Sequence, residues 1–156
     1  MLKNKNIVFL VIAVAIALYG FWQKKLPDVQ SQAPSSENAH QINSAKSDQV
    51  LKQAYQQQQN KLQIQGSGIV SKTLPDDNKG SRHQRFIIKL ASGQSLLVAH
   101  NIDLAPRLPG LKKGDSVNFY GQYEWSEQGG VIHWTHNDPK QRHNNGWLKY
   151  KGKLYQ

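Results

Sequence analysis

The chain contains no cysteine among its 156 residues. This absence excludes disulfide bonds, thiolate zinc sites, cysteine nucleophiles and acylation of an N-terminal lipoprotein cysteine. Any bound metal must be held by His, Asp or Glu, which suits zinc, nickel, copper or manganese better than iron–sulfur chemistry. The sequence also lacks a Ser nucleophile elbow, a Walker loop, a dinucleotide-binding fingerprint and an HExxH motif.

Acidic residues are scarce: 10 Asp and Glu face 20 Lys and Arg, which gives a formal net charge of +10. Residues 1–25 carry four Lys and no acid, and residues 66–156 carry thirteen Lys or Arg against seven acids. A positive C-terminal domain favours anionic partners such as nucleic acid, phospholipid headgroups or acidic polysaccharide. A solvated basic surface with no specific partner explains the same charge equally well.

Residues 1–25 have the basic, apolar, basic pattern of a membrane-targeting segment. Two lysines precede an apolar run from Ile7 to Trp22, and Lys24 and Lys25 follow it. We expect an uncleaved anchor whose single span is residues 7–22, with the C-terminal domain in the periplasm or outside the cell. A cleaved signal peptide, and hence a secreted protein, is the alternative; it is disfavoured because its small-x-small site at residues 15–17 lies inside the apolar run.

Residues 26–47 are rich in Gln, Ser, Ala and Pro, and this composition predicts a disordered linker. Residues 48–61 are predicted to form an amphipathic helix, because Val50, Leu51, Ala54 and Tyr55 recur at helical spacing behind a Ser or Asp cap. We expect this helix to pack onto the domain that follows.

The pattern changes to short strands over residues 62–156. Segments rich in β-branched and aromatic residues alternate with turns rich in Gly, Pro, Asn and Asp. These features predict a mainly β domain, with a small five-stranded OB-like barrel as first choice, because a long, Gly-containing first strand can bend across two sheets. SH3-like barrels and small sandwiches stay open, and a hairpin over residues 147–155 is expected to follow. The five predicted strands are Ile64–Leu74, Arg82–Leu90, Ser95–Asn101, Asp115–Trp125 and Val131–His136.

Histidine is concentrated near the C-terminus, with three of the six residues between positions 133 and 143. Imidazole titrates near neutral pH and is the commonest metal ligand. On a continuous strand His133 and His136 would point to opposite faces, so they share a ligand only if the strand ends near Thr135.

A divalent metal such as zinc has its best predicted ligands in the loop after this strand. His136, Asp138 and His143 lie within loop reach of one another, and His83 or His100 would complete the set from across the barrel. The alternative is that these groups fix a long loop to the barrel through hydrogen bonds.

Two further clusters lie at strand ends, where small barrels commonly place ligand contacts. The first follows the apolar stretch of residues 96–99 and includes an expected ion pair between Asp103 and Arg107. The second opens a strand with His83 and Arg85 on one face, where they can contact a phosphate or a carboxylate. The ligand-binding candidates are Arg82, His83, Arg85, His100, Asn101, Asp103, Arg107, Glu124, Trp134, His136, Asp138 and His143.

Four unusual sequence segments occur in order along the C-terminal part of the chain: Arg82–Phe86, His100–Arg107, Gly121–Trp125 and Gly129–Pro139. Together they resemble the bacterial family DUF3465, a domain family of unknown function. The resemblance covers about residues 62–156 and implies one compact domain behind an N-terminal signal or anchor. It implies no activity and no catalytic residue.

Three functions agree with these features. The preferred one is an exported, membrane-tethered OB-like module that binds a polyanion, a nucleic acid or another envelope ligand through its exposed aromatics and through Arg82, Arg85, Arg107, Lys140 and Arg142. The second is a metal-dependent hydrolase or nuclease that uses the histidine cluster, with Glu124 or Asp103 as proton acceptor. The third is a structural accessory of an envelope complex, with a protein partner that the sequence does not identify.

Overall fold

The computed structural model describes residues 36–156. The predicted anchor, and the first part of the predicted linker, lie outside this range. Within it, no helix has both the length and the apolar character required to cross a bilayer.

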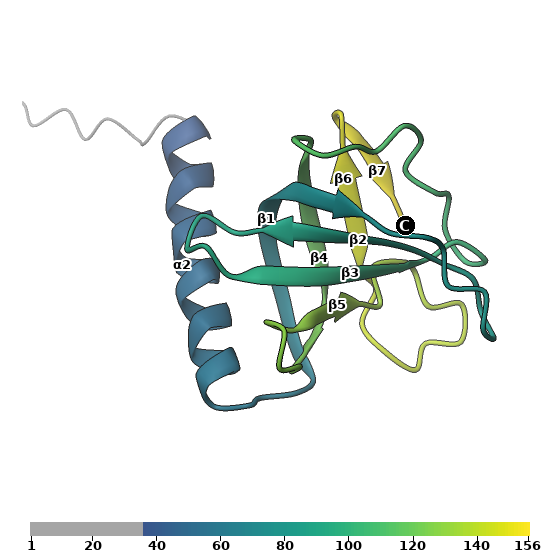
Figure 1. The fold of residues 1–156 in the computed structure, drawn as a ribbon, viewed down its shortest axis with the longest axis horizontal. Helices are drawn as coiled ribbons and strands as arrows, with labels where there is room; N and C mark the ends of the chain where they lie inside the picture. Colours follow the sequence, from purple (N-terminus) through teal and green to yellow (C-terminus); the bar gives the residue numbers. More distant parts are fainter. Residues whose placement is uncertain (1–35) are drawn as a thin grey trace, which may run out of the picture. The chain divides into compact units, whose positions relative to one another are not determined.

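The described chain folds as a closed five-stranded barrel with one helix and a C-terminal hairpin (Figure 1). The barrel order is β1-β2-β3-β5-β4, and β1 pairs with β4 to close it. β3 and β5 are parallel, whereas the other pairs are antiparallel. The predicted mainly β, OB-like fold is thereby confirmed. The strands are β1 (Leu62–Thr73), β2 (His83–Lys89), β3 (Ser95–Asn101), β4 (Ser116–Glu124), β5 (Val131–His133), β6 (Trp147–Tyr150) and β7 (Lys153–Tyr155).

The long strand β1 belongs to both halves of the barrel. Residues 62–69 pair with β4, residues 69–73 pair with β2, and the register shifts between Val70 and Lys72. The predicted passage of the first strand across two sheets is therefore observed, with its irregularity at the register shift. Glycine at position 66 leaves room for the side chain of its partner on β4, because a Cβ there would lie 2.6 Å from Cζ of Phe119.

One edge of β4 is shared by two later strands. β5 pairs with residues 122–124 of β4, and β6 pairs with residues 117–120. Residues 134–146 leave the sheet between these two pairings, opposite Gly121. We call residues 134–146 the histidine loop. β5 ends at His133, three residues earlier than predicted, because Trp134 adopts a left-handed φ of 53° that an extended strand does not allow.

Helix α2 (Ser36–Gln56) begins twelve residues before the predicted start at residue 48, so the prediction of a linker up to residue 47 is wrong from Ser36 onward. The strong helix formers Ala, Gln, Glu and Lys make up five of the ten residues 37–46. The prediction missed them because it depended on apolar spacing, which is weak in that stretch. The helix also ends at Gln56, before the predicted residue 61.

Helix α2 runs beside the barrel (Figure 1), and side chains of its C-terminal half reach the core. Leu51 and Ala54 are fully buried in the core, as their spacing predicted, whereas Val50 of the same predicted face is 42% exposed. Asp48 lies inside the helix and not at its start, so it is no N-cap; its Oδ2 instead accepts a 2.8 Å hydrogen bond from the backbone N–H of Ser92. Tyr55 stacks on Trp125 with ring centroids 6.5 Å apart.

Candidate functional site

Tight backbone contacts hold the two ends of the histidine loop together, and we call this crossing the neck of the loop. The N–H of Gly146 donates to the carbonyl of His136 at 2.9 Å. A Cβ on Gly146 would overlap the carbonyl oxygens of Trp134 and Tyr120, so the crossing at the neck admits only glycine. The histidine loop is thus a compact loop whose two ends lie next to each other beside β4.

The carboxylate of Asp138 organises the interior of this loop. It accepts backbone N–H groups from Lys140 at 2.9 Å, from His143 at 3.1 Å and from Arg142. Burial acts against the charged form, but these three donors outweigh it and lower the pKa of Asp138 below its ordinary value. Asp138 is therefore placed to hold the loop together.

Three rings pack beside that carboxylate. The ring centroid of Trp134 lies 4.0 Å from that of His143 and 5.9 Å from that of His136, and the two imidazoles are 5.3 Å apart. Burial lowers the pKa of His136. The Nε2 atom of His143 is buried without a hydrogen-bond partner among the described residues and lies 3.6 Å from Oδ2 of Asp138.

His100 lies in the barrel core and is bound through both ring nitrogens. Its Nδ1 is 2.8 Å from Oγ1 of Thr135, and its Nε2 is 3.1 Å from the carbonyl of Pro106. The carbonyl can only accept, so Nε2 carries the proton and Nδ1 accepts from the threonine hydroxyl. Burial lowers the pKa of His100 to about 4, which keeps the ring neutral.

The structure brings together three of the predicted metal ligands, His136, Asp138 and His143, within one loop. His100 is engaged by the protein on both sides, and Nδ1 of His83 lies 2.8 Å from the carbonyl of Ser81. Within residues 36–156, no group of three or more His, Asp or Glu side chains is placed to hold a metal ion. A divalent metal therefore stays a prediction.

The predicted ion pair between Asp103 and Arg107 is not formed; each residue has another partner. Asp103 accepts from Nε of Arg82 at 2.7 Å, and Arg107 pairs with Asp76. The cause is local, because the side chain of Asn101 accepts the N–H of Asp103 at 2.9 Å and turns the loop back toward β2. Backbone and side-chain hydrogen bonds from Arg82 lower the pKa of Asp103.

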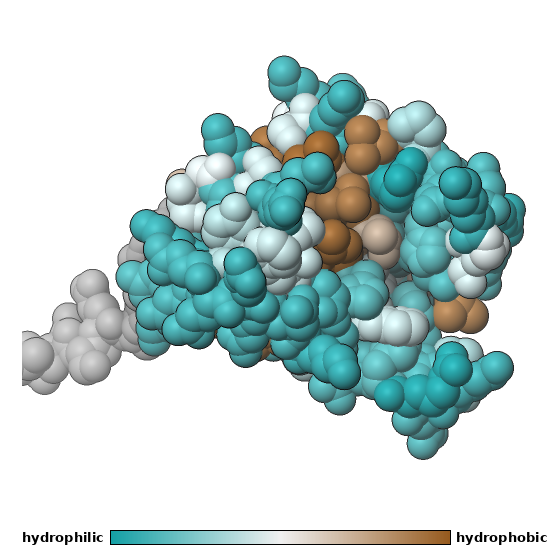
Figure 2. Space-filling view, turned by 60° about the horizontal axis from the view of Figure 1, so that its bottom comes forward, coloured by the Kyte–Doolittle hydropathy of each residue, from teal (hydrophilic) through white to brown (hydrophobic). Residues whose placement is uncertain are grey.

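The outer face of strands β2, β3 and β5 carries a strip of half-buried apolar side chains. Registers place Ile87 beside Leu97, and Leu97 beside Val131. Ala99 lies next along β3, opposite Arg85. We call Ile87, Leu97, Ala99 and Val131 the outer strip. Figure 2, in which the bottom of Figure 1 comes forward, shows hydrophobic side chains gathered in a hollow between hydrophilic flanks.

A cavity of about 320 Å³ adjoins the outer strip. His83 and Arg85 of β2 lie on one side of it, and Glu124 and His133 lie on the other, with Nε2 of His133 3.6 Å from Oε1 of Glu124. Burial lowers the pKa of His133, against the opposing effect of Glu124. Four residues that the sequence analysis singled out thus line the same cavity. They are His83, Arg85, Glu124 and His133. Its lining residues are Asp77, His83, Arg85, Ala99, Glu124, Val131 and His133.

The outer strip was missed at the sequence level, although a signal for it exists. Leu97 and Val131 alternate with buried residues, so strict period-two alternation puts them on the outer face. Continuous apolar runs such as residues 96–99 instead suggest a strand buried on both sides. Alignment of β3 with β5 was needed to see that the outward residues form one strip.

Comparison with protein families finds a match over most of the chain. The family model described as "Protein of unknown function (DUF3465)" matches residues 36–156. This range includes helix α2 as well as the barrel, whereas the resemblance noted in the sequence began at about residue 62. No curated protein matches the chain.

Proposed function

We propose that this chain, which belongs to the DUF3465 family, is an OB-type binding module for an anionic ligand with flat apolar parts. The observation that carries the proposal is the outer strip, which meets the cavity lined by Arg85 and His83 on one face of the barrel. The apolar part of the ligand would lie on the strip. Its acidic group would reach Arg85 and His83.

Arg85 is the best placed cation for such a ligand. Its Nε donates to the carbonyl of Pro75 at 3.1 Å, which fixes the side chain and leaves the terminal nitrogens of the guanidinium available. Arg82 and Arg107 are engaged by Asp103 and Asp76, so their charges are already compensated. Among the residues that the structure describes, Arg85 has no carboxylate partner, and the proposal rests on this arginine and its neighbouring histidine. The two carboxylates of the same cavity are engaged by other groups, Asp77 by the N–H of Lys79 and Glu124 by Nε2 of Gln122.

A single-stranded nucleic acid has the required chemistry, because its bases present flat, apolar faces and its phosphates are anionic. Heparin supplies charge without flat apolar parts, so it separates the two contributions. We expect labelled dT12 to bind more tightly than heparin, with affinity that falls as salt rises.

The direct test is fluorescence anisotropy with Arg85→Gln and, as a charge-matched control, Lys153→Gln on β7. Removing one phosphate contact should weaken binding and reduce the slope of log K against log salt by about 0.7. The control variant should leave the affinity and the salt slope unchanged. Equal effects of the two variants would mean that only overall charge attracts the ligand, and the proposed site would then be wrong.

We also propose that residues 1–25 tether the module to the inner membrane, with the barrel in the periplasm. The support is the basic, apolar, basic pattern around residues 7–22. Resistance of the full chain to alkaline extraction from membranes, together with an active alkaline phosphatase fused after Gln156, is the expected result. A chain found only in the soluble fraction, or an inactive fusion, would contradict it.

The two other functions keep specific tests. Near-stoichiometric zinc or manganese in the purified chain, removed by His136→Ala, would favour the metal-dependent hydrolase. Co-purification of an envelope protein without any ligand binding would favour the structural accessory. Neither has the support that the cavity beside Arg85 gives to the binding module.

A further inference from the structure

A second face of the barrel, formed by β1, β4 and β6, carries amide and aromatic side chains. The β1–β4 register pairs Gln63 with Gln122 and Gln65 with Tyr120. The β4–β6 register then pairs Tyr120 with Trp147. Asn118 lies two residues along β4, on the same side of the strand. We call Gln63, Gln65, Asn118, Tyr120, Gln122 and Trp147 the amide–aromatic face.

Tyr120 and Trp147 form a platform of neighbouring rings on this face. Their centroids are 6.2 Å apart and the ring planes are inclined by 35°. Both side chains are partly exposed, whereas Tyr123 and Tyr150 of the same strands are buried in the core. Aromatic rings left partly exposed on a sheet offer a large apolar surface that keeps a polar tip.

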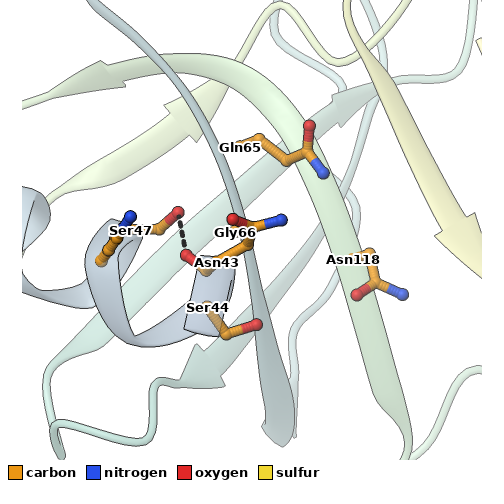
Figure 3. A pocket seen from close by; sticks show the side chains of 7 residues that line it. Asn43, Ser44, Ser47, Gln65, Gly66 and Asn118 are labelled. Atoms are coloured by element: carbon orange, nitrogen blue, oxygen red, sulfur yellow. Dashed lines mark hydrogen bonds between the residues drawn. The ribbon is translucent and has the colours of Figure 1, made fainter. Parts of the chain in front are cut away.

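The amides of this face differ in their hydrogen bonding. Nε2 of Gln122 donates to Oε1 of Glu124 at 2.6 Å, whereas the buried Nε2 atom of Gln63 has no hydrogen-bond partner within the described chain. Gln65 and Asn118 line a cavity of about 270 Å³ between helix α2 and strands β1 and β4. In this cavity Figure 3 marks a single hydrogen bond, from Oγ of Ser47 to the carbonyl of Asn43, so the two amides are not bonded to each other.

The lining of this cavity is polar and nearly uncharged. Hydroxyl and amide groups of α2 face those of β1 and β4, and Lys46 is the one charged residue among the described residues that line the cavity. An amide both donates and accepts hydrogen bonds, as does a sugar hydroxyl. A pyranose ring also presents an apolar C–H surface that can lie flat on an aromatic ring. The lining residues are Asn43, Ser44, Lys46, Ser47, Gln65, Gly66 and Asn118.

We propose that the amide–aromatic face binds a neutral oligosaccharide. One sugar ring lies on Tyr120 and Trp147, and the next extends past Asn118 and Gln65 into the cavity beside α2. A polyanion fits this face less well, because Lys149, opposite Asn118, and Lys46 supply its few positive charges. The face shares no residue with the outer strip or with the cavity lined by Arg85, although Nε2 of Gln122 donates at 2.6 Å to Oε1 of Glu124, which lines that cavity. The ring platform and the cavity beside α2 lie elsewhere on β1, β4 and β6, so this inference does not depend on the function proposed above.

The test is isothermal titration calorimetry of the full chain with short neutral oligosaccharides of N-acetylglucosamine, glucose and galactose. We expect at least one to bind with an affinity that hardly changes between low and high salt. Trp147→Leu should weaken that binding about tenfold, as loss of a stacked ring does, and Trp147→Tyr should restore most of it. Asn118→Ala and Gln65→Ala should each weaken it about fivefold.

Two controls make the result decisive. Gln128→Ala replaces an exposed glutamine on the β4–β5 loop and should leave the affinity unchanged. Thermal unfolding of each variant identifies any that fail to fold, and Gln65→Ala, an exposed position, gives the test if Trp147→Leu does not fold. Absence of binding to every neutral sugar, or binding that these substitutions leave intact, would overturn the inference. Binding of dT12 that is weakened by Trp147→Leu would instead assign the face to nucleic acid.

Discussion

Oγ1 of Thr135, in the histidine loop, lies 2.8 Å from Nδ1 of His100, in the barrel core. Both side chains are fully buried. This bond joins the start of the loop to strand β3, so the loop is anchored to the core by a polar contact that water cannot replace. Two of the predictions below follow from it.

Replacing Thr135 with Val should destabilise the fold by about 1–3 kcal/mol. The shape is kept, but Nδ1 of His100 loses its donor inside the core, and an unsatisfied buried acceptor has a cost of this size. Chemical denaturation followed by tryptophan fluorescence measures the change. Thr73→Val, at an exposed position of β1, is the matched control and should change stability by less than about 0.5 kcal/mol.

Stability should fall as the pH is lowered from 6.5 toward 4. Burial holds the pKa of His100 near 4 in the folded state, against an ordinary value of 6.5, so only the unfolded chain binds a proton in this window. The full contribution is present above pH 6.5, and about 3 kcal/mol is lost by pH 4. His133 and His136, whose pKa values are also lowered, add a loss of the same sign.

Denaturation curves between pH 4 and 7 test this prediction. His100→Gln, which cannot titrate, should lower stability at pH 7 yet flatten its dependence on pH. A variant with the same slope as the natural chain would show that His100 is not the main titrating group.

Asp138→Asn should loosen the histidine loop without unfolding the barrel. An amide has one acceptor oxygen, whereas the carboxylate receives three backbone N–H groups from Lys140, Arg142 and His143. Hydrogen exchange at these three amides should quicken at least about tenfold, an increase that corresponds to roughly 1.4 kcal/mol of lost local stability. Exchange at core residues of β3 should stay slow; equal loss of protection there would mean that the loop and barrel unfold together.

Gly146→Ala should destabilise the fold by more than about 3 kcal/mol, because the added Cβ meets backbone atoms of Trp134 and Tyr120 that have no room to move. Gly93→Ala is the control: its φ is +88° with open space around it, so the cost is backbone strain of about 1 kcal/mol. Thermal unfolding compares the two. Similar losses would mean that the neck of the loop is more adaptable than its contacts imply.

The barrel could be predicted from local patterns because each strand has its own signal. Ser95–Asn101 was predicted with its observed bounds, and the other strands, apart from β5, differ from their predictions by at most two residues at either end. The predicted β5 was too long. Trp134 and Thr135 have strand propensity, but the geometry of the neck imposes a left-handed backbone at Trp134. Tertiary contact overrode local preference at that point.

The candidate sites were less predictable, because they depend on which strands become neighbours. His83 and Arg85 were identified by their shared face, but their proximity to Glu124 and His133 follows from the order β2-β3-β5-β4. His100 was a candidate ligand because it is a histidine at a strand end. Period-two alternation puts it on the buried face of β3 with Leu96 and Val98. The partners of its two ring nitrogens, Thr135 and Pro106, depend on the fold and could not be predicted from that pattern.

The most direct test of the proposed function is amide chemical-shift mapping with dT12 on isotope-labelled protein. The account predicts shifts concentrated at Leu97, Ala99, Val131 and His133, together with Arg85, and their loss in Arg85→Gln. Shifts confined to the lysines of β6 and β7, or none at ligand concentrations well above micromolar, would contradict it.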